Sequence, residues 1–341
     1  MQDNSQKATL REVALSAGVS LKTASRVLNN EPHVKPAREA AVRAAIKRLA
    51  YRPNELARGL KGRHSGVIGI VVPFLSHYFM AGCIQAIHHA ASDIGFTIMV
   101  SVSDGNPEKE ADQIRTLQQH QVEGFIIFPT TKSLQSKSAA ELAGTPVVIA
   151  DQPTGVPEMD SILVANRETA RAVVDHLIGH GYSKIAVIGA NRHLYTISER
   201  IVGYRDAVQA AHLKAIELVS SSEGELTIAA IRKLLEPPAK HPRAVFTLNS
   251  AATIKVLNAL KHSHLRVPED VAVFGFDDFD TAEAFQPSIS VASQPIEKIG
   301  NAAVELLVKR IRQKRDRKGQ KLVLAPKIIL RASCGCKQVP S

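Results

Sequence analysis

The sequence predicts a small all-α module at the N-terminus followed by a larger α/β region. Residues 1–63 contain no apolar run of strand length, whereas such runs recur from Gly66 onward and alternate with helical stretches. The chain has 341 residues, of which 45% are apolar. A chain of this length is too long to fold around one ordinary hydrophobic core. We therefore expect two or three packed units.

Positive charge is concentrated in the N-terminal module. Residues 1–63 carry 13 Lys and Arg side chains against 5 Asp and Glu, and the remaining 278 residues carry 30 against 27. A short segment with such an excess is the expected footprint of a module that contacts phosphate. Charge alone does not distinguish this from a basic solvated surface.

Composition excludes several protein classes. No stretch approaches the roughly 20 apolar residues that a membrane helix needs, and Met1 to Lys7 shows no secretory signal, so we expect a cytoplasmic protein. Cys83, Cys334 and Cys336 are too few and too unevenly spaced for a disulfide framework. Because no second pair completes a zinc site with the two terminal cysteines, we expect three reduced thiols, no metal and no cofactor.

Residues 9–29 predict two short helices joined by a tight turn. Thr9 and Glu12 form a capping box that starts the first helix. Gly18 suits the end of that helix because a positive φ is easy there, and Ser20 can cap the second helix. This pattern indicates a helix-turn-helix, in which the second helix enters the DNA major groove. A small helical bundle is the alternative, since the bare pattern is common.

The second helix directs Ala24, Val27 and Leu28 inward and leaves Leu21, Lys22 and Arg26 outward. Arg26 can pair with guanine, Lys22 can reach a base acceptor or a phosphate, and Leu21 can pack on a thymine methyl. Hydroxyl and amide donors suited to phosphate oxygens are Thr9, Ser20, Thr23, Ser25 and Asn29.

A third helix is expected from Pro36 to about Ala50, adding Ala40, Ile46 and Leu49 to the small core.

After the third helix, Asn54 is a good N-cap for about two helical turns, which are too short to be stable alone. Leu56 and Leu60 form an apolar edge that suits a wedge in the minor groove. A flexible linker with incidental leucines is the alternative.

Beyond residue 66, continuous apolar strands separated by helices predict doubly wound α/β units with parallel sheets. About 270 residues of this pattern suggest two units. The expected strands are Val67–Val72, Thr97–Val102, Gly124–Phe128, Val147–Ala150, Ile185–Ile188, Ala244–Leu248 and Val271–Phe276. The expected helices between them include Gly82–Ile94, Pro107–His120 and Thr169–His180.

Eight sequence segments in order resemble the lactose/galactose repressor (LacI/GalR) family of bacterial transcription regulators. They are GVSLKTASRVLNNEPHV from residue 18, LAYRPNELARGLKG from 49, GVIGIVVP from 66, VEGFIIFP from 122, ERIVGY from 199, VPEDVAVFGFDD from 267, QPSISVASQP from 286 and LRASC from 330. The resemblance covers essentially the whole chain.

The resemblance implies roles for residues of the first module. Leu21, Lys22 and Arg26 would read bases, and Leu60, with Ala57 beside it, would be the hinge-helix leucine that inserts into the minor groove. The residues that would contact the DNA backbone are Thr9, Ser20, Thr23, Ser25, Asn29, His33, Tyr51 and Asn54. Ala24 and Lys35 replace the usual Val and Ser, so a helix cap is lost at Lys35.

The resemblance also implies a domain organisation. Residues 1–53 would be the helix-turn-helix headpiece, 54–65 the hinge helix and linker, and 66–341 a core like that of periplasmic sugar-binding proteins. Three crossovers would join its two lobes, with an N-lobe of about 66–164 and 296–323 and a C-lobe of about 165–293 and 324–336. The ligand would bind in the cleft between them, at the carboxyl ends of the strands.

The resemblance places a small-molecule effector in that cleft. Arg200 matches the family's effector-binding arginine and Asp277 its hydroxyl-accepting aspartate. The other candidates are Phe74, His77, Tyr78, Phe79, Asn249 and Gln294; the aromatic ones can instead belong to the lobe core. Ser250 and Ala165 replace acids common in the family, and His77, Arg192 and His193 add positive charge, which favours a sugar acid or sugar phosphate over a neutral sugar.

The function expected from these features is a cytoplasmic, nucleoid-associated regulator, in the first place a repressor. Its partners would be double-stranded palindromic operator DNA, a sugar, sugar acid or sugar phosphate, and a second copy of the chain. No leucine heptad follows Arg331, so we expect a homodimer. The alternatives are a cytosolic sugar-binding protein and a dinucleotide-dependent enzyme, but no Gly-rich phosphate-binding motif supports the enzyme.

Overall fold

The computed structural model describes residues 8–28, 31–51, 65–130, 141–142, 144–156, 158–235, 242–313 and 318–336. The chain divides into two compact units, Met1–Ser65 and Gly66–Ser341. Asn29, Asn54, Ala57 and Leu60 lie outside the described residues, so their expected roles stay predictions. No helix in the described ranges is long and apolar enough to cross a membrane.

The first unit contains three helices, α1 (Leu10–Ser16), α2 (Leu21–Leu28) and α3 (Pro36–Arg48). The capping box at α1 is confirmed: Thr9 N donates to the Glu12 carboxylate at 2.6 Å, and Glu12 N donates to Thr9 Oγ1 at 3.3 Å. Gly18 has a φ of +65° in the turn, and Ser20 Oγ accepts from Thr23 N at 3.1 Å. Lys35 precedes α3 without a side-chain cap.

The core of this unit is small and made mostly of β-branched and alanine side chains. Its buried members are Val13, Ala14, Ala24, Val27, Val42 and Ala45. The expected inward position of Ala40 is wrong, because Ala40 is exposed and α3 turns Val42 and Ala45 toward α1 and α2. Ile46 and Leu49 pack at the edge of the same cluster.

The second unit contains two six-stranded sheets, each with helices on both faces, which confirms the doubly wound α/β class. We call the parts around them the N-lobe and the C-lobe. All strand pairs are parallel except the pair between β10 and β12.

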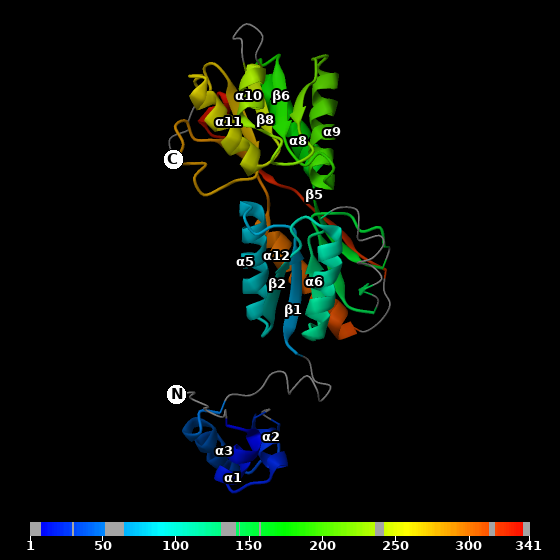
Figure 1. Cartoon of the computed structure of the whole chain (residues 1–341), viewed down its shortest axis with the longest axis vertical. Coiled ribbons are helices and arrows are strands. Elements are labelled where there is room, and N and C mark those ends of the chain that lie inside the picture. Colours follow the sequence, from blue (N-terminus) through cyan, green and yellow to red (C-terminus); the bar gives the residue numbers. More distant parts are fainter. Residues whose placement is uncertain are drawn as a thin grey trace. The chain divides into compact units, whose positions relative to one another are not determined.

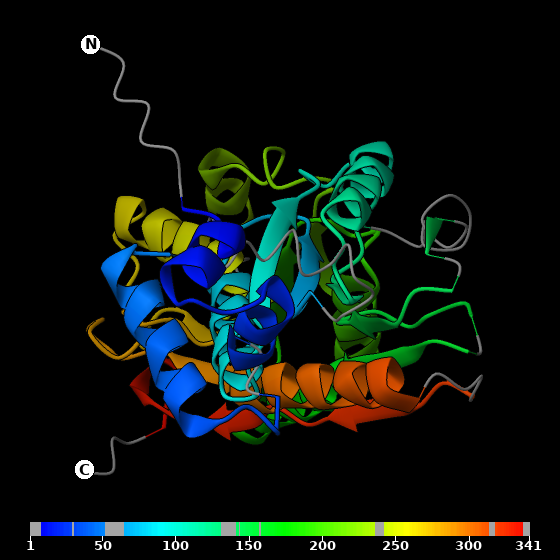
Figure 2. The same cartoon turned by 90° about the horizontal axis from the view of Figure 1, so that it is seen from below.

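The N-lobe sheet has the order β11-β5-β4-β3-β1-β2. Its strands are β1 (Val67–Val72), β2 (Thr97–Val102), β3 (Gly124–Ile127), β4 (Val147–Ala150), β5 (Asp160–Val164) and β11 (Lys321–Leu324). Helices α5 (Tyr78–Ser92) and α12 (Ile296–Gln313) pack together over one face, and α6 (Pro107–Gln119) covers the other. Figure 2 shows α12 (orange) and α6 (blue-green) on opposite sides of this sheet.

The C-lobe sheet has the order β12-β10-β9-β8-β6-β7. Its strands are β6 (Ile185–Gly189), β7 (Ile216–Val219), β8 (Ala244–Thr247), β9 (Ala272–Phe276), β10 (Ser290–Ser293) and β12 (Lys327–Ile329). Its helices are α8 (Asn166–Gly179) and α9 (Tyr195–Ala210) on one face, α10 (Ile228–Leu235) and α11 (Ser250–His262) on the other, and the short 3-10 helix η2 (Ala332–Cys334).

Three connections cross between the lobes: β5 to α8, β10 to α12, and β11 to β12. Figure 1 shows the last of these as the red segment that passes from one lobe to the other. The apolar runs predicted seven strands but missed β5, β7, β10, β11 and β12. These five strands contain Asp, Ser, Glu or Lys residues that interrupt the apolar pattern.

Helices α8 and α9 pack so closely that glycine is required at one position. A Cβ on Gly203 would lie 2.2 Å from the backbone oxygen of Arg167 and 2.9 Å from the Ala170 Cβ. Neither neighbour is the end of a flexible side chain, so a methyl group there must push the helices apart.

We therefore expect Gly203→Ala to lower the free energy of unfolding of the core by about 2–3 kcal/mol, and its melting temperature by about 5–10 °C. Gly179→Ala is the matched control, because Gly179 is also helical and nothing lies within 4 Å of its added Cβ. The control should melt no lower than wild type, since alanine favours helix. Equal melting temperatures for the two variants would contradict the close packing of α9 on α8.

Candidate functional site

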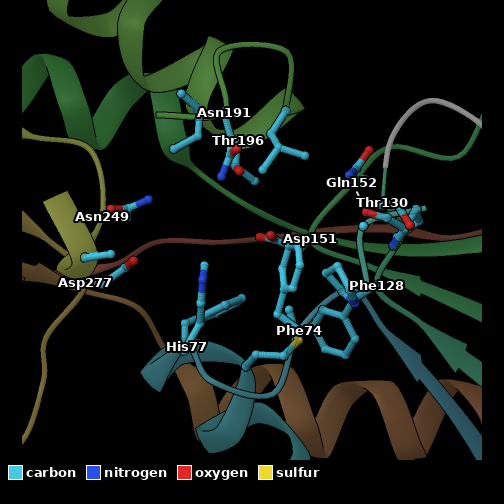
Figure 3. Close-up of a pocket in the computed structure, with 18 of the residues that line it drawn as sticks. Phe74, His77, Phe128, Thr130, Asp151, Gln152, Asn191, Thr196, Asn249 and Asp277 are labelled. Atoms are coloured by element: carbon cyan, nitrogen blue, oxygen red, sulfur yellow. Dashed lines mark hydrogen bonds between the residues drawn. The ribbon is translucent and has the colours of Figure 1, made fainter. Parts of the chain in front are cut away.

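A cavity of about 330 Å³ lies between the two lobes, at the carboxyl ends of their strands. Residues following β1, β3 and β4 line it from the N-lobe, and residues following β6, β8 and β9 line it from the C-lobe. Figure 3 shows side chains of both lobes directed into this hollow. Its volume is in the range of small-molecule sites.

Arg200 on α9 is the central cation of the cavity wall, and only 3% of it is exposed. Its Nε donates to Asn166 Oδ1 at 2.7 Å, and its Nη1 donates to the backbone oxygen of Leu248 at 2.6 Å. Its guanidinium carbon lies 3.6 Å from the ring centroid of Phe276, and Nη1 lies 3.8 Å from Asp277 Oδ1. Burial lowers the pKa of Arg200, while the nearby carboxylates favour its charged form.

Within the described residues, no protein hydrogen bond is made by Nη2 of Arg200. The guanidinium is therefore held in place on one side and can offer a donor to a ligand on the other.

Asp277 follows β9 and has a φ of +71°, which directs the residue out of the strand. Gln294 Nε2 donates to Asp277 Oδ1 at 2.6 Å. The Gln294 Oε1 is buried without a hydrogen-bond partner among the described residues, so an acceptor is left for a hydroxyl group. Asn249 uses its side-chain oxygen to cap α11, accepting from Ala252 N at 2.8 Å.

Asp151, which follows β4, is the acid that faces the cavity from the N-lobe (Figure 3). Its Oδ1 is buried and has no hydrogen-bond partner among the described residues. Burial raises the pKa of Asp151 to about 7, although the positive charge of Arg200 acts in the opposite direction. Asp151 is thus partly protonated near neutral pH, and it can donate to or accept from a ligand.

An ion pair joins the lobes at the edge of the cavity. His77 Nε2 of the N-lobe lies 3.3 Å from Glu223 Oε1 of the C-lobe. The close approach of the two groups raises the pKa of His77 and lowers the pKa of Glu223. Glu223 is also fixed through its backbone oxygen, which accepts from Lys255 Nζ at 2.6 Å.

Aromatic side chains form the apolar part of the N-lobe wall. Phe74, Phe79 and Phe128 line the cavity, and the ring of Phe74 stacks on His77 with centroids 5.6 Å apart. Such surfaces suit the apolar face of a sugar ring, while the polar groups opposite them fix its orientation.

The structure brings together seven of the eight predicted effector residues, namely Phe74, His77, Phe79, Arg200, Asn249, Asp277 and Gln294. Tyr78 is not among the lining residues; it is 42% exposed, and its ring lies 6.1 Å from that of Phe279. The roles of the seven stay predictions.

Sequence reasoning missed several polar lining residues, which are Thr130, Asp151, Gln152, Asn191, Thr196 and Ser221. Asp151 had a usable signal, because it directly follows the predicted strand Val147–Ala150 and strand ends face the cleft. Thr196 had no comparable signal, since it lies inside a helix.

The charge argument for an acidic effector is weaker in the structure than in the sequence. Arg192 is not among the lining residues and pairs with Glu217 at 3.3 Å, and His77 pairs with Glu223. His193 does line the cavity, but two acids, Asp151 and Asp277, line it together with Arg200.

The first unit presents a second candidate surface, a shallow groove beside α2. Its lining consists of Leu10, Arg11, Leu21, Lys22, Ser25, Arg26 and Glu31. Leu21 is 51% exposed although it is apolar, and Lys22 and Arg26 are exposed beside it. Arg26 Nε lies 3.5 Å from Glu31 Oε2.

The predicted phosphate-contacting residues differ in their surroundings. Thr9, Ser20 and Thr23 take part in the helix caps described above, and Ser20 Oγ and Thr23 Oγ1 are 2.9 Å apart. His33 is exposed with a φ of +74°, and Tyr51 packs at the edge of the small core.

Comparison with known proteins matches parts of both units to known domain families. Residues 9–54 match the family model "Bacterial regulatory proteins, lacI family", and residues 174–334 match the "Periplasmic binding protein-like domain". The ribose operon repressor of Escherichia coli K12 is 31% identical over 330 residues, covering 96% of this chain and 99% of the relative.

The chain belongs to the LacI family of bacterial regulatory proteins.

Other LacI-family members are similar over the same length. The HTH-type transcriptional repressor PurR of Vibrio atlanticus is 29% identical, covering 96% of this chain and 98% of the relative. A structure of the transcriptional regulator CelR with cellobiose has a TM-score of 0.70 at 29% identity, covering 96% of this chain and 100% of that one. The lac repressor dimer bound to operator and the anti-inducer ONPF has a TM-score of 0.86 at 23% identity, with 96% and 99% coverage, and confirms the fold.

The raised pKa of Asp151 predicts how core stability depends on pH. The folded state keeps the Asp151 proton between about pH 4 and 7, where the unfolded chain releases it, so stability should fall as pH rises through this window and then level off. Asp151→Asn should remove this fall and make the core more stable than wild type at pH 8 by about 2 kcal/mol. We expect less than the full linkage value of about 4 kcal/mol because the cavity admits water.

Urea denaturation between pH 4 and 8 measures this difference. The exposed Asp280→Asn is the control and should follow the wild-type pH dependence. An Asp151→Asn curve parallel to wild type would show that Asp151 is ionised throughout.

Proposed function

We propose that this LacI-family chain is a sequence-specific repressor whose operator affinity is controlled by a small molecule bound between the lobes of the core. The observation that supports DNA binding is the exposed surface of α2, where Leu21, Lys22 and Arg26 lie side by side on a short helix held by a separate small core. A half-exposed leucine beside two cations suits the major groove.

We propose the following division of labour along the chain. Residues 1–53 form the DNA-reading headpiece, 54–65 form a hinge helix that is stable only on DNA, and 66–341 bind the effector and a second copy of the chain. The composition of the hinge supports this role, because a two-turn helix with Leu56 and Leu60 on one edge needs a partner to form.

Within the headpiece, Arg26 reads guanine, Lys22 reads a base or phosphate, and Leu21 contacts a thymine methyl. The Arg26–Glu31 ion pair is partly exposed, so its exchange for a base contact costs little. The residues proposed to hold the DNA backbone are Thr9, Ser20, Thr23, Ser25, Asn29, His33, Tyr51 and Asn54, with Ala57 and Leu60 in the minor groove.

For the effector, we propose a small polyhydroxylated compound, a sugar or an uncharged sugar derivative. Asp151, Asp277 and the Gln294 side-chain oxygen are acceptors for hydroxyl groups, and Arg200 is a donor to ring or hydroxyl oxygens. The negative charge of Asp277 offsets the positive charge of Arg200, and Asp151 is partly ionised, so these three groups give no excess of positive charge to attract an acid or phosphate.

Control of DNA binding follows from where these groups lie. A ligand that contacts Asp151 in the N-lobe and Arg200 in the C-lobe favours one lobe arrangement over others, and it shifts the equilibrium only by its difference in affinity between them. The hinge segment joins the headpiece directly to β1 of the N-lobe in sequence, so a change of lobe arrangement in a dimer alters the separation of the two hinges.

We further propose that the chain acts in the cytoplasm as a homodimer and has no enzymatic activity. A dimer supplies the two headpieces that a palindromic operator requires. The exposed apolar residues Leu322 and Val323 on edge strand β11, together with Ile328 and Leu330, offer apolar surface for contact between copies.

Selection of random duplex DNA by the full-length protein at near-physiological salt tests the DNA-reading role. We expect a palindrome whose recovery falls with Arg26→Ala and whose central step is less constrained with Leu60→Ala. Arg26→Ala should weaken specific binding by about 1–3 kcal/mol and relax one base position in each half-site.

Arg43→Ala is the control for lost positive charge, because Arg43 is exposed on α3 and paired with Glu39 at 2.7 Å. Its selected sequence should be unchanged. Binding that stays weak and blind to sequence with every candidate effector added would favour the alternative, a cytosolic sugar-binding protein.

Calorimetry of the full chain with neutral sugars, sugar acids and sugar phosphates tests the effector class. We expect a neutral sugar to bind and Asp277→Asn to weaken that binding by about 10-fold or more, because a hydrogen bond to a charged acceptor contributes about 1.5–3 kcal/mol. Tyr78→Phe is the control outside the cavity and should bind as wild type does. Exclusive binding of acids or phosphates would contradict the proposed effector class and restore the expectation from sequence.

A further inference from the structure

Four side chains that can bind a metal meet at one end of the C-lobe, away from the effector cavity. His176 lies in the last turn of α8, and His180 is the C-cap of the same helix. Cys334 and Cys336 come from the C-terminal segment, more than 150 residues later in the chain. The four ligand atoms all lie within 4.8 Å of one another.

The separations between these atoms fit a tetrahedral metal. His176 Nε2 is 3.4 Å from Cys334 Sγ and 3.6 Å from Cys336 Sγ, and His180 Nε2 is 3.3 Å from Cys336 Sγ. Zinc bonds of about 2.3 Å to sulfur and about 2.0 Å to nitrogen place S and N ligands about 3.5 Å apart in a tetrahedron. All three measured distances are close to this value.

Local structure explains how two distant segments supply the ligands. A spacing of four residues places both histidines on one face of α8, and their rings are 4.7 Å apart. Gly335 has a φ of +93°, and a Cβ there would lie 2.7 Å from the Tyr182 hydroxyl, so only glycine makes this turn. The turn brings both cysteines to the same side.

Neighbouring groups support the inner ligands. Ser290 Oγ lies 3.1 Å from Cys334 Sγ and can donate to it, and Phe274 packs edge-on against His176 with centroids 5.9 Å apart. A hydroxyl donor to a thiolate and an apolar wall beside an imidazole are typical surroundings of a metal site. Cys334 is completely buried, so the sulfur has no access to solvent water.

We propose that His176, His180, Cys334 and Cys336 bind one zinc ion that fastens the C-terminal segment to α8. Two thiolates and two imidazoles are a ligand set that favours zinc, and four protein ligands leave no open position, so the site is structural. Binding releases the protons of the two thiols to solvent. The zinc closes a chain loop of about 160 residues that contains most of the C-lobe.

The experiment uses the full-length protein, reduced and stripped of metal by a chelator. Addition of Co²⁺ should give the absorption of a tetrahedral thiolate complex at one equivalent per chain, and Zn²⁺ should abolish that absorption by replacing cobalt. Zinc in excess should raise the melting temperature by about 5 °C or more. This readout needs neither DNA nor effector, so it is independent of the proposed function.

Matched variants locate the site. Cys336→Ser and His180→Gln should each weaken zinc binding by about 100-fold or more. Cys83→Ala and His120→Gln should leave it unchanged; His120 is the exposed C-cap of α6, as His180 is of α8. Absence of the cobalt absorption in the reduced wild type, or equal zinc affinity of Cys336→Ser and wild type, would overturn the proposal. So would a Cys334–Cys336 disulfide in protein isolated without oxidant.

Discussion

The arrangement of the C-lobe cavity wall depends on the buried guanidinium of Arg200. Removing a charge from water is costly, and the cost is offset only when hydrogen bonds and opposite charge surround it. Asn166, the Leu248 carbonyl and Asp277 provide these partners from three different parts of the lobe. Each of those parts is therefore held at a fixed distance from α9, and the cavity is largely formed before a ligand arrives. Substitution of any of these partners should therefore destabilise the lobe.

The N-lobe contributes groups of a different kind. Asp151 has a raised pKa and an oxygen without a hydrogen-bond partner in the part of the chain that the structure describes, and His77 reaches across the cleft to Glu223. The His77–Glu223 pair is about one-third exposed, so it contributes little to stability, and it can break without a large penalty. Buried hydrogen bonds thus hold the C-lobe wall, whereas the His77–Glu223 contact between the lobes is weak. This combination suits a protein in which the binding free energy of one small ligand is enough to rearrange the lobes.

The sequence predicted more of the fold than of the cavity. Capping residues and apolar runs act locally, so short stretches of sequence were enough to predict α1, α2 and strands such as β1 and β4. Edge and crossover strands such as β5 and β11 begin with polar residues that shorten their apolar runs, and their neighbours in the sheet make them strands. Ala40 was placed inward because alanine fits either face of a helix, and the position of α3 against α1 and α2 decides which face is buried.

The cavity and the cysteine cluster illustrate two reasons for failure. Asp151 was missed although its position after a strand was visible, because no charged pattern accompanied it. The spacing of His176 and His180 was also visible, but nothing in the sequence relates them to Cys334 and Cys336, which approach only when β9 and β10 place the C-terminal segment beside α8. The absence of a second cysteine pair therefore did not exclude a metal site, since histidines can replace it.

Helix α8 connects these two regions of the C-lobe. Its first residue, Asn166, accepts from Arg200, and its last turn carries His176 beside the C-terminal segment. A helix packed against α9 without room for a methyl group at Gly203 moves as a rigid body, so anchoring one end restrains the other. The same C-terminal segment holds Asp278 through Arg331 Nη1 at 3.2 Å, one residue from Asp277. The C-terminal segment is thus linked to the cavity wall in two ways, through α8 to Arg200 and through Arg331 to Asp278. Its attachment to the lobe therefore affects the positions of the residues that line the cavity.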